Sequence, residues 1–284
     1  MRVLIYSDNH WCQYSSIVRK RGEKYSLRLE NQIASINWAE RLSLEMGCNK
    51  VVHLGDFFDS AVLNAEEISA LKEINWNKHI FHYFLCGNHE MGSSDLSFNS
   101  IRALGLCPFI DVIDKPYMQT EQDVVFIYLP YILEENREPL LHYIPSKEEC
   151  EGRKRIVFSH NDIKGIQMGQ FISKEGFEID DIRLNCDLFL NGHLHNGEKL
   201  SDKIINVGNL TGQNFSENAF KYDHCAYILD TDTMKVEVYE NPFALNFYKL
   251  DFTNSVDYNI FNQLKNAVIT VKCKEKDYKS ISDA

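Results

Sequence analysis

The nine residues Val51-Val52-His53-Leu54-Gly55-Asp56-Phe57-Phe58-Asp59 decide the fold of this chain. The first four form a short apolar run, which is typical of a buried strand, and Gly55-Asp56 ends it abruptly. Because open α/β sheets bind their ligands beyond the carboxyl ends of their strands, this position predicts a functional carboxylate at Asp56.

Four further stretches repeat this design, and each is a hydrophobic strand whose end carries Asp, Asn or His. Their ends read Ser7-Asp8-Asn9-His10, Gly87-Asn88-His89-Glu90, Ser159-His160 and Gly192-His193-Leu194-His195. We expect the five strand ends to meet around two metal ions, with Asp56 between the ions.

The rest of the chain predicts an α/β protein with a two-layer β core flanked by helices. Apolar residues recur at helical spacing over 26–46, and Gly47 ends that helix. Further helices are expected after Asn64, after Ser93 or Ser94, and over 134–144, with short strands over 110–129 and a hairpin over 224–240. Pro242 predicts a boundary between a catalytic domain, residues 1–242, and a small α/β appendage, residues 243–284.

Composition excludes several classes of protein. The 284 residues are 44% hydrophobic and 25% charged, as in ordinary globular chains. No apolar run approaches the roughly 20 residues that span a bilayer, so we expect no membrane partner. The eight cysteines form no C-x-x-C pair, which favours reduced thiols in a cytoplasmic protein. A net charge of −11 argues against a broad basic surface that coats nucleic acid.

The chemistry of the strand ends favours divalent cations. Asp8 and His10 are two residues apart, so in an extended segment both side chains reach one ion, and His193 and His195 repeat this spacing. Carboxylate and imidazole ligands suit Mn²⁺, Fe²⁺ or Zn²⁺, and the lack of a thiolate argues against a structural zinc site. Taken singly, each motif also fits a plain turn, a helix cap or a buried core histidine; only their order and common position favour a metal site.

This ordered set of motifs resembles the calcineurin-like metallophosphoesterase superfamily over residues 1 to about 240. Within it, Gly55-Asp56-Phe57-Phe58-Asp59 and Asn206-Val207-Gly208-Asn209-Leu210-Thr211 look most like the SbcD-type DNA repair nucleases, which include phage-encoded members. The resemblance implies a four-layer αββα fold and two-metal hydrolysis of phosphodiesters.

The resemblance also implies a role for each residue. The first metal would be held by Asp8, His10, Asp56 and His195, and the second by Asp56, Asn88, His160 and His193. His89 would lie beside the metals, where it could stabilise the transition state or protonate the leaving group. The metals would be Mn²⁺, with Fe²⁺, Zn²⁺ or Mg²⁺ as alternatives.

The sequence departs from the nuclease pattern in a few places. Glu90 stands where Asp is frequent, Asp59 where some members have His, and Asn209 where Ser is frequent. Relatives carry a longer DNA-capping domain and a segment that docks on an ATPase. Only about forty residues remain here after Pro242, so we expect both to be reduced, absent or cut off.

A basic loop follows the first metal motif and carries Arg19, Lys20, Arg21 and Lys24. It could contact DNA phosphates, and Trp11, Tyr14 and Tyr25 could stack on unpaired bases, although a solvated loop is an equal alternative. Arg153-Lys154-Arg155 precedes its strand and is expected at the opposite end.

Three hypotheses follow. The first is a Mn²⁺-dependent DNA exo- or endonuclease of repair or recombination, with DNA and an SbcC-type ATPase as partners and a homodimer as a possible assembly. The second is a phosphodiesterase or phosphatase for nucleotides or phosphoproteins, because one core serves all of these. The third is a catalytically silent binding module, which the complete set of ligand residues disfavours.

Overall fold

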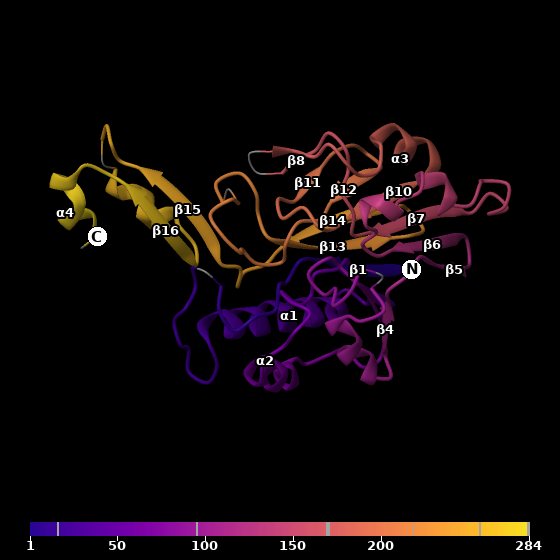
Figure 1. Cartoon of the computed structure of the whole chain (residues 1–284), viewed down its shortest axis with the longest axis horizontal. Coiled ribbons are helices and arrows are strands. Elements are labelled where there is room, and N and C mark those ends of the chain that lie inside the picture. Colours follow the sequence, from indigo (N-terminus) through magenta and orange to yellow (C-terminus); the bar gives the residue numbers. More distant parts are fainter. Residues whose placement is uncertain (16, 95, 169–170, 218, 256, 283–284) are drawn as a thin grey trace.

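The computed structural model describes residues 1–15, 17–94, 96–168, 171–217, 219–255 and 257–282 (Figure 1). Its α-helices are α1 (Leu27–Glu45), α2 (Ala65–Ala70), α3 (Ile179–Asn185) and α4 (Tyr278–Ser282), and its 3₁₀ turns are η1 (Leu71–Glu73), η2 (Ser100–Leu106), η3 (Glu134–Asn136), η4 (Leu140–His142), η5 (Tyr258–Gln263) and η6 (Glu275–Asp277). Its strands are β1 (Arg2–Tyr6), β2 (Lys50–His53), β3 (Phe81–Leu85), β4 (Ile110–Ile113), β5 (Tyr117–Glu121), β6 (Val124–Leu129), β7 (Lys154–Ser159), β8 (Gln167–Met168), β9 (Phe171–Ile172), β10 (Leu188–Asn191), β11 (Glu198–Lys199), β12 (Ile204–Asn206), β13 (Cys225–Asp230), β14 (Lys235–Glu240), β15 (Asn246–Asp251) and β16 (Ala267–Lys272).

Two six-stranded sheets form the centre of the described structure. The first has the order β14-β13-β1-β2-β3-β4 and the second the order β11-β12-β10-β7-β6-β5. Strands β1 to β4 are parallel, and so are β6, β7, β10 and β12. Each sheet therefore brings several carboxyl strand ends to one edge.

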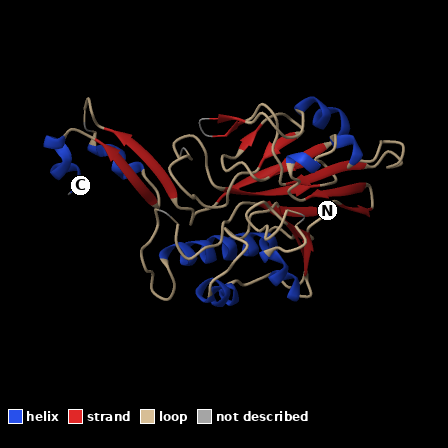
Figure 2. Ribbon diagram, viewed as in Figure 1, coloured by secondary structure: helices blue, strands red, loops and turns tan. Residues whose placement is uncertain are grey.

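The sheets pack face to face and helices cover their outer faces. Side chains from both sheets, such as Val52 and Phe158, form one buried cluster between them. A second cluster joins the first sheet to α1 through Leu29 and Ile36, and a third joins the other sheet to α3 through Ile182. Figure 2 shows these layers, with α1 and α2 on one side and α3 on the other. The predicted α/β fold with two β layers flanked by helices is confirmed.

Local signals explain the helix that was best predicted. The side chain of Ser26 accepts a hydrogen bond from the N–H of Leu29 and caps α1, and Gly47 follows the helix with a φ of 62°. The helix predicted after Asn64 is shorter than expected. Asn64 and Glu67 form a capping box, but α2 ends at Ala70 and continues only as η1.

Two other helix predictions fail for local reasons. The single helix expected over 134–144 is replaced by η3 and η4, because Pro139 interrupts the backbone hydrogen bonds between them. The helix expected after Ser93 or Ser94 is η2, and its cap is Asn99, which accepts from the N–H of Arg102. Helix α3 was not predicted.

The predicted appendage follows β14 and projects away from the two sheets (Figure 1). Its strands β15 and β16 are parallel, and Leu250, Phe252 and Ile281 form a small cluster of their own. The division at Pro242 stays a prediction, and residues 256, 283 and 284 of the appendage lie outside the described residues.

Candidate active site

The predicted ligand residues lie directly beyond the carboxyl ends of five parallel strands. Strand β1 leads to Asp8 and His10, β2 to Asp56, and β3 to Asn88, while β7 and β10 lead to His160 and to His193 and His195. The first three strands belong to one sheet and the last two to the other. Because the sheets pack face to face, the two sets of loops meet at one edge of the sandwich.

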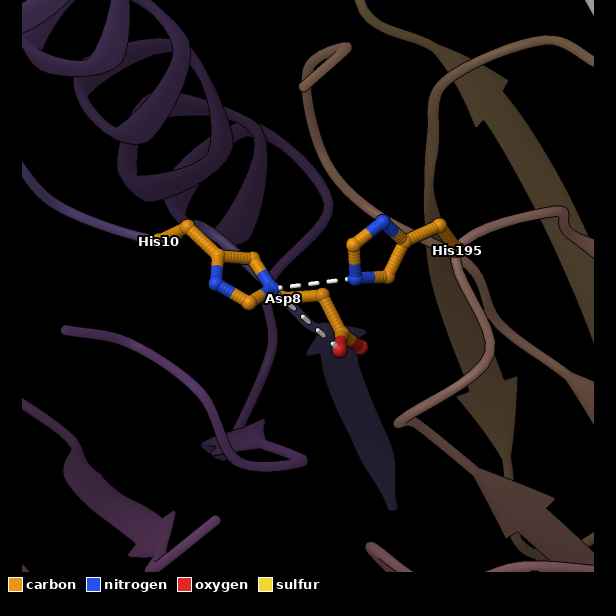
Figure 3. A group of neighbouring side chains, drawn as sticks. All are labelled: Asp8, His10 and His195. Carbon is orange, nitrogen blue, oxygen red and sulfur yellow. Dashed lines mark hydrogen bonds and ion pairs between the residues drawn. The ribbon is translucent and has the colours of Figure 1, made fainter. Parts of the chain in front are cut away.

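One group of ligand atoms comes from Asp8, His10 and His195, whose ligand atoms all lie within 4.8 Å of one another. The Nε2 atoms of His10 and His195 are 3.1 Å apart, and His10 Nε2 is 3.9 Å from Asp8 Oδ1. Figure 3 shows the two imidazole rings pointing toward each other, with the Asp8 carboxylate beside them. Oδ1 of Asp8 is buried and accepts no hydrogen bond from the described residues.

A second group comes from Asp56, His160 and His193, together with the amide of Asn88. His160 Nε2 lies 3.1 Å from Asp56 Oδ2 and 3.3 Å from Asn88 Oδ1, and His193 Nδ1 lies 3.0 Å from the same amide oxygen. All seven predicted ligand residues are thus brought together, in two neighbouring groups.

Asp56 lies between the two groups. Its Oδ2 is 3.1 Å from His160 Nε2 in one group and 3.9 Å from His10 Nε2 in the other. Its Oδ1 accepts the N–H of His89 at 2.9 Å, which fixes the orientation of the carboxylate. A carboxylate in this position can bridge two ions.

The second ring nitrogen of every ligand histidine is held by an oxygen. His10 Nδ1 lies 3.0 Å from Asp59 Oδ1, and His195 Nδ1 lies 3.2 Å from Glu217 Oε1. His160 Nδ1 lies 2.6 Å from the carbonyl of Leu54, and His193 Nε2 lies 3.3 Å from Asp162 Oδ1. Such partners set the tautomer of metal-ligating histidines and leave the other nitrogen free to bind. This arrangement and the unpartnered oxygen of Asp8 fit a pair of divalent cations.

Burial and charge shift the pKa values in this cluster. Burial lowers the pKa of His10, which favours the neutral imidazole that binds metals. Burial acts in the same direction on His160, but the Asp56 carboxylate outweighs it and raises the pKa of His160 to about 9. Burial raises the pKa of Asp56, yet His160 more than reverses this and holds it well below its usual range. A cation that binds here must therefore displace the proton on His160.

The backbone conformation of the ligands differs from the extended one that the spacing argument assumed. Asp8, His10, Asp56 and His193 have φ values of 51°, 47°, 52° and 74°. These left-handed conformations let the strand ends turn sharply into the site. His193 and His195 lie in different groups, which agrees with the assignment that the resemblance implies, although their spacing alone would let both reach one ion. The close approach of the loops requires Gly87, because a Cβ there would lie 2.1 Å from Asp56 Oδ1.

Glu90 joins two of the strand ends and was not predicted to do so. Its buried carboxylate accepts hydrogen bonds from the N–H groups of Asp56 at 3.2 Å, Phe58 at 2.9 Å and Gly87 at 2.6 Å. Burial and then the Asp56 charge raise the pKa of Glu90 to about 8. The side chain clamps the loop of the bridging carboxylate to the loop that carries Asn88.

His89 forms a third group with His10 and Asp59, whose ligand atoms also lie within 4.8 Å of one another. Its ring is edge-to-face with His10 at 4.5 Å, and its side chain is 40% exposed. Nδ1 lies 3.1 Å from the carbonyl of Asp59 and 3.8 Å from that residue's carboxylate. Nε2 is therefore the nitrogen available to a substrate.

Two of the residues that position the ligand histidines, Glu217 and Asp162, had no detectable signal in the sequence, because both lie in loops without a motif. Asp59 belongs to the motif that carries the resemblance, but its contact with His10 was not predicted. Glu217 also accepts the N–H of Gln213 and a hydrogen bond from Asn209, so it organises the whole loop near His195.

The basic loop is folded against α2 and η1. Arg21 pairs with Glu66 at 2.6 Å, and Lys24 pairs with Glu73 at 2.7 Å. Arg19 and Lys20 are exposed. The suggestion that nearby aromatic residues stack on bases was wrong for Trp11 and Tyr25, whose side chains are buried in the core, whereas Tyr14 is 39% exposed.

The chain belongs to the calcineurin-like phosphoesterase family, because the family model matches residues 1–229. It is therefore a metallophosphoesterase, and the two groups around Asp56 are its candidate metal sites. No curated protein matches the chain.

Solved structures with a similar fold share little sequence with it. An archaeal phosphodiesterase is 15% identical over 84% of this chain and 99% of its own, with a TM-score of 0.43. A dimetal phosphatase from Danio rerio is 12% identical over 80% of this chain and 91% of its own, with a TM-score of 0.44. A purple acid phosphatase from yellow lupin is 13% identical over 84% of this chain and 52% of its own, with a TM-score of 0.49.

Proposed function

We propose that this metallophosphoesterase hydrolyses phosphodiester bonds in DNA, as a Mn²⁺-dependent exo- or endonuclease of the SbcD type in repair or recombination. The observation that carries the proposal is Gly55-Asp56-Phe57-Phe58-Asp59, which resembles the nuclease branch and supplies the bridging carboxylate.

The chain's own side chains divide the chemical work. Two divalent ions, when bound, neutralise phosphate oxygens and lower the pKa of a bound water. Asp56 holds its carboxylate between the two candidate sites. His89 donates a proton from Nε2 to the leaving oxygen, while Asp59 accepts from Nδ1 and fixes the ring. His10 contacts both His89 and Asp59, and these contacts fix the position of His89 beside the first site.

Charge near the site supports a polymeric anion as substrate. Arg19 and Lys20 are exposed in the loop that follows the first metal motif, and no described acidic side chain pairs with them. Phosphate contacts of this kind position a nucleic acid without reading its sequence. In a chain of net charge −11 these two side chains would supply positive charge for such contacts.

The test is cleavage of linear duplex and single-stranded DNA with Mn²⁺, beside a chromogenic diester such as bis(p-nitrophenyl) phosphate. The double variant Arg19→Glu/Lys20→Glu should weaken DNA binding about tenfold or more, with a shallower salt dependence, and leave diester turnover unchanged. The matched control Lys78→Glu/Lys147→Glu reverses two exposed lysines that precede β3 and β7, at the end opposite the metals, and should change neither. Diester turnover without any DNA cleavage contradicts the proposal.

A second candidate is a phosphodiesterase or phosphatase for small phosphoesters or phosphoproteins. The observation that favours it is the pairing of Arg21 and Lys24 with Glu66 and Glu73, which removes half of the predicted basic loop from DNA binding. Turnover of nucleotides that exceeds turnover of DNA is the outcome that selects it.

The proposed partners follow from the nuclease assignment. We expect an SbcC-type ATPase subunit, a homodimer as the assembly, and action in the cytoplasm. Among the described residues, no helix is both long and apolar enough to cross a membrane. Light scattering of the purified chain, alone and with such an ATPase, tests the two assemblies.

A further inference from the structure

A buried arginine lies behind the first group of ligands. Arg28, on α1, is 1% exposed, and no carboxylate of the described residues forms an ion pair with it. Its guanidinium donates to Cys12 Sγ at 3.0 Å, to the carbonyls of His10 and Gly212 at 3.4 Å each, and to the side-chain oxygen of Gln213. A buried charge without a counter-ion is costly, so these contacts must keep it in place.

Two glutamines extend this set of donors. Gln32 lies one helical turn after Arg28 and donates to the carbonyls of Asn9 and His10 at 2.7 Å each. Gln213 donates to the carbonyls of Asp8 at 3.3 Å and Asn9 at 3.2 Å. Together the three side chains hold every backbone carbonyl from Asp8 to His10.

These carbonyls belong to a strained segment. Asp8 and His10 both have left-handed φ values, and such a conformation costs roughly 1–2 kcal/mol for each residue with a side chain. It persists because the surrounding donors determine the direction of each carbonyl. The conformation in turn aims the Asp8 carboxylate and the His10 ring at His195.

The same network reaches the third ligand of this group. Gln213 donates its backbone N–H to Glu217 at 2.9 Å, and Glu217 holds His195 Nδ1 at 3.2 Å. The second group depends on these side chains less directly, because the rings of His160 and His193 are held by Leu54 and Asp162. It is linked to the Asp8–His10 segment by the N–H of His193, which donates to Asp8 Oδ2 at 3.0 Å, and by the carbonyl of Asp56, which accepts the N–H of His10 at 3.0 Å.

We propose that Arg28, Gln32 and Gln213 are positioning residues that set the affinity of the first metal site and affect the second far less. This role concerns the candidate metal sites and is independent of DNA as the substrate.

The test isolates each site before the network is perturbed. A His160→Ala background disrupts the second group, and a His195→Ala background disrupts the first. Gln32→Met, which keeps the volume and removes the donor, is added to each background, and Mn²⁺ binding is measured by calorimetry and by electron paramagnetic resonance. Glu40→Gln is the matched control, since Glu40 is a buried polar residue of the same helix that contacts no ligand.

In the His160→Ala background Gln32→Met should weaken Mn²⁺ binding about 10- to 100-fold, as for other residues that orient ligands. In the His195→Ala background it should change binding less than twofold, and Glu40→Gln should change neither. Arg28→Met should act as Gln32→Met does, and Arg28→Lys should restore part of the affinity. If Arg28→Met does not fold, the Mn²⁺ affinities of the Gln32→Met variants alone test the proposal. Equal weakening of both sites, or no weakening of the first, overturns the proposal.

Discussion

Removal of the Glu90 carboxylate should both destabilise the fold and slow catalysis. The side chain accepts three buried backbone N–H groups, from Asp56, Phe58 and Gly87. Each donor left without a partner costs about 1–3 kcal/mol, and a water in the vacated space keeps the loss near the lower figure. Glu90→Ala should therefore lower the free energy of unfolding by about 3 kcal/mol.

Glu90→Gln should lower the free energy of unfolding less than Glu90→Ala does, because the amide oxygen can still accept the two N–H groups that now donate to Oε2. Only the third donor faces the amide NH₂, so the expected loss is about 1–2 kcal/mol. Because the clamp joins the loops of Asp56 and Asn88, kcat/KM for a chromogenic diester should fall roughly 10- to 100-fold in both variants.

Urea unfolding gives the stabilities, and Mn²⁺-dependent turnover gives the activity of the folded fraction. Asp187→Ala is the control, since Asp187 accepts the N–H of Arg155 at 2.8 Å at the opposite end of the sheet. It should lose stability and keep its activity per folded molecule. A loss of less than about 1 kcal/mol in Glu90→Ala, or full turnover by this variant, would contradict the role given to Glu90.

Three further outcomes are expected. His89→Gln should lower kcat about 10²- to 10⁴-fold, because this side chain transfers a proton to the leaving group. Mn²⁺ binding, measured by calorimetry, should stay unchanged, and a loss of metal binding would contradict that role. When each ion is supplied at 100 times its Kd, removal of that ion by EDTA should lower the free energy of unfolding by about 2.7 kcal/mol. Thermal melts with and without EDTA measure this change, and no change would show that metal binding does not stabilise the fold. Burial raises the pKa of Glu40 from 4.5 to about 8, so the unfolded chain releases this proton first and stability falls as pH rises through that range. The neighbouring His82, whose pKa burial lowers to about 4, affects stability only below about pH 6.5. Between pH 6.5 and 8 the free energy of unfolding of the parent, measured in urea, should therefore fall by roughly 1.5 kcal/mol more than that of Glu40→Gln. Parallel curves for the two proteins would contradict a buried, protonated Glu40.

The parts of the fold that could be predicted are those whose signals are local. The run before Gly55 predicts β2, and Ser26 and Gly47 mark the two ends of α1. Helix α3 lacks such a signal, because Ile182 is the one buried residue in it. The helix predicted over 134–144 is divided into η3 and η4 by Pro139, which has no N–H to continue the backbone hydrogen bonds.

The candidate site also has a part that could be predicted from local sequence and a part that could not. The identity of the ligand residues could be proposed because each follows a strand, and their distribution over two groups came from family resemblance. The left-handed backbone at Asp8 and His10 could not be predicted, since it is imposed by donors on α1 and by Gln213, about two hundred residues away. For the same reason Glu217 and Asp162 carry no pattern, and only the folded chain brings them to their histidines.

We expect Asp56 to bridge two metal ions. Anomalous scattering from crystals grown with Mn²⁺ would locate these ions. Two peaks are expected about 3.5–4 Å apart on either side of the Asp56 carboxylate, with His195 on one and His193 on the other. A single peak, or two histidines of this pair on one ion, would contradict this expectation.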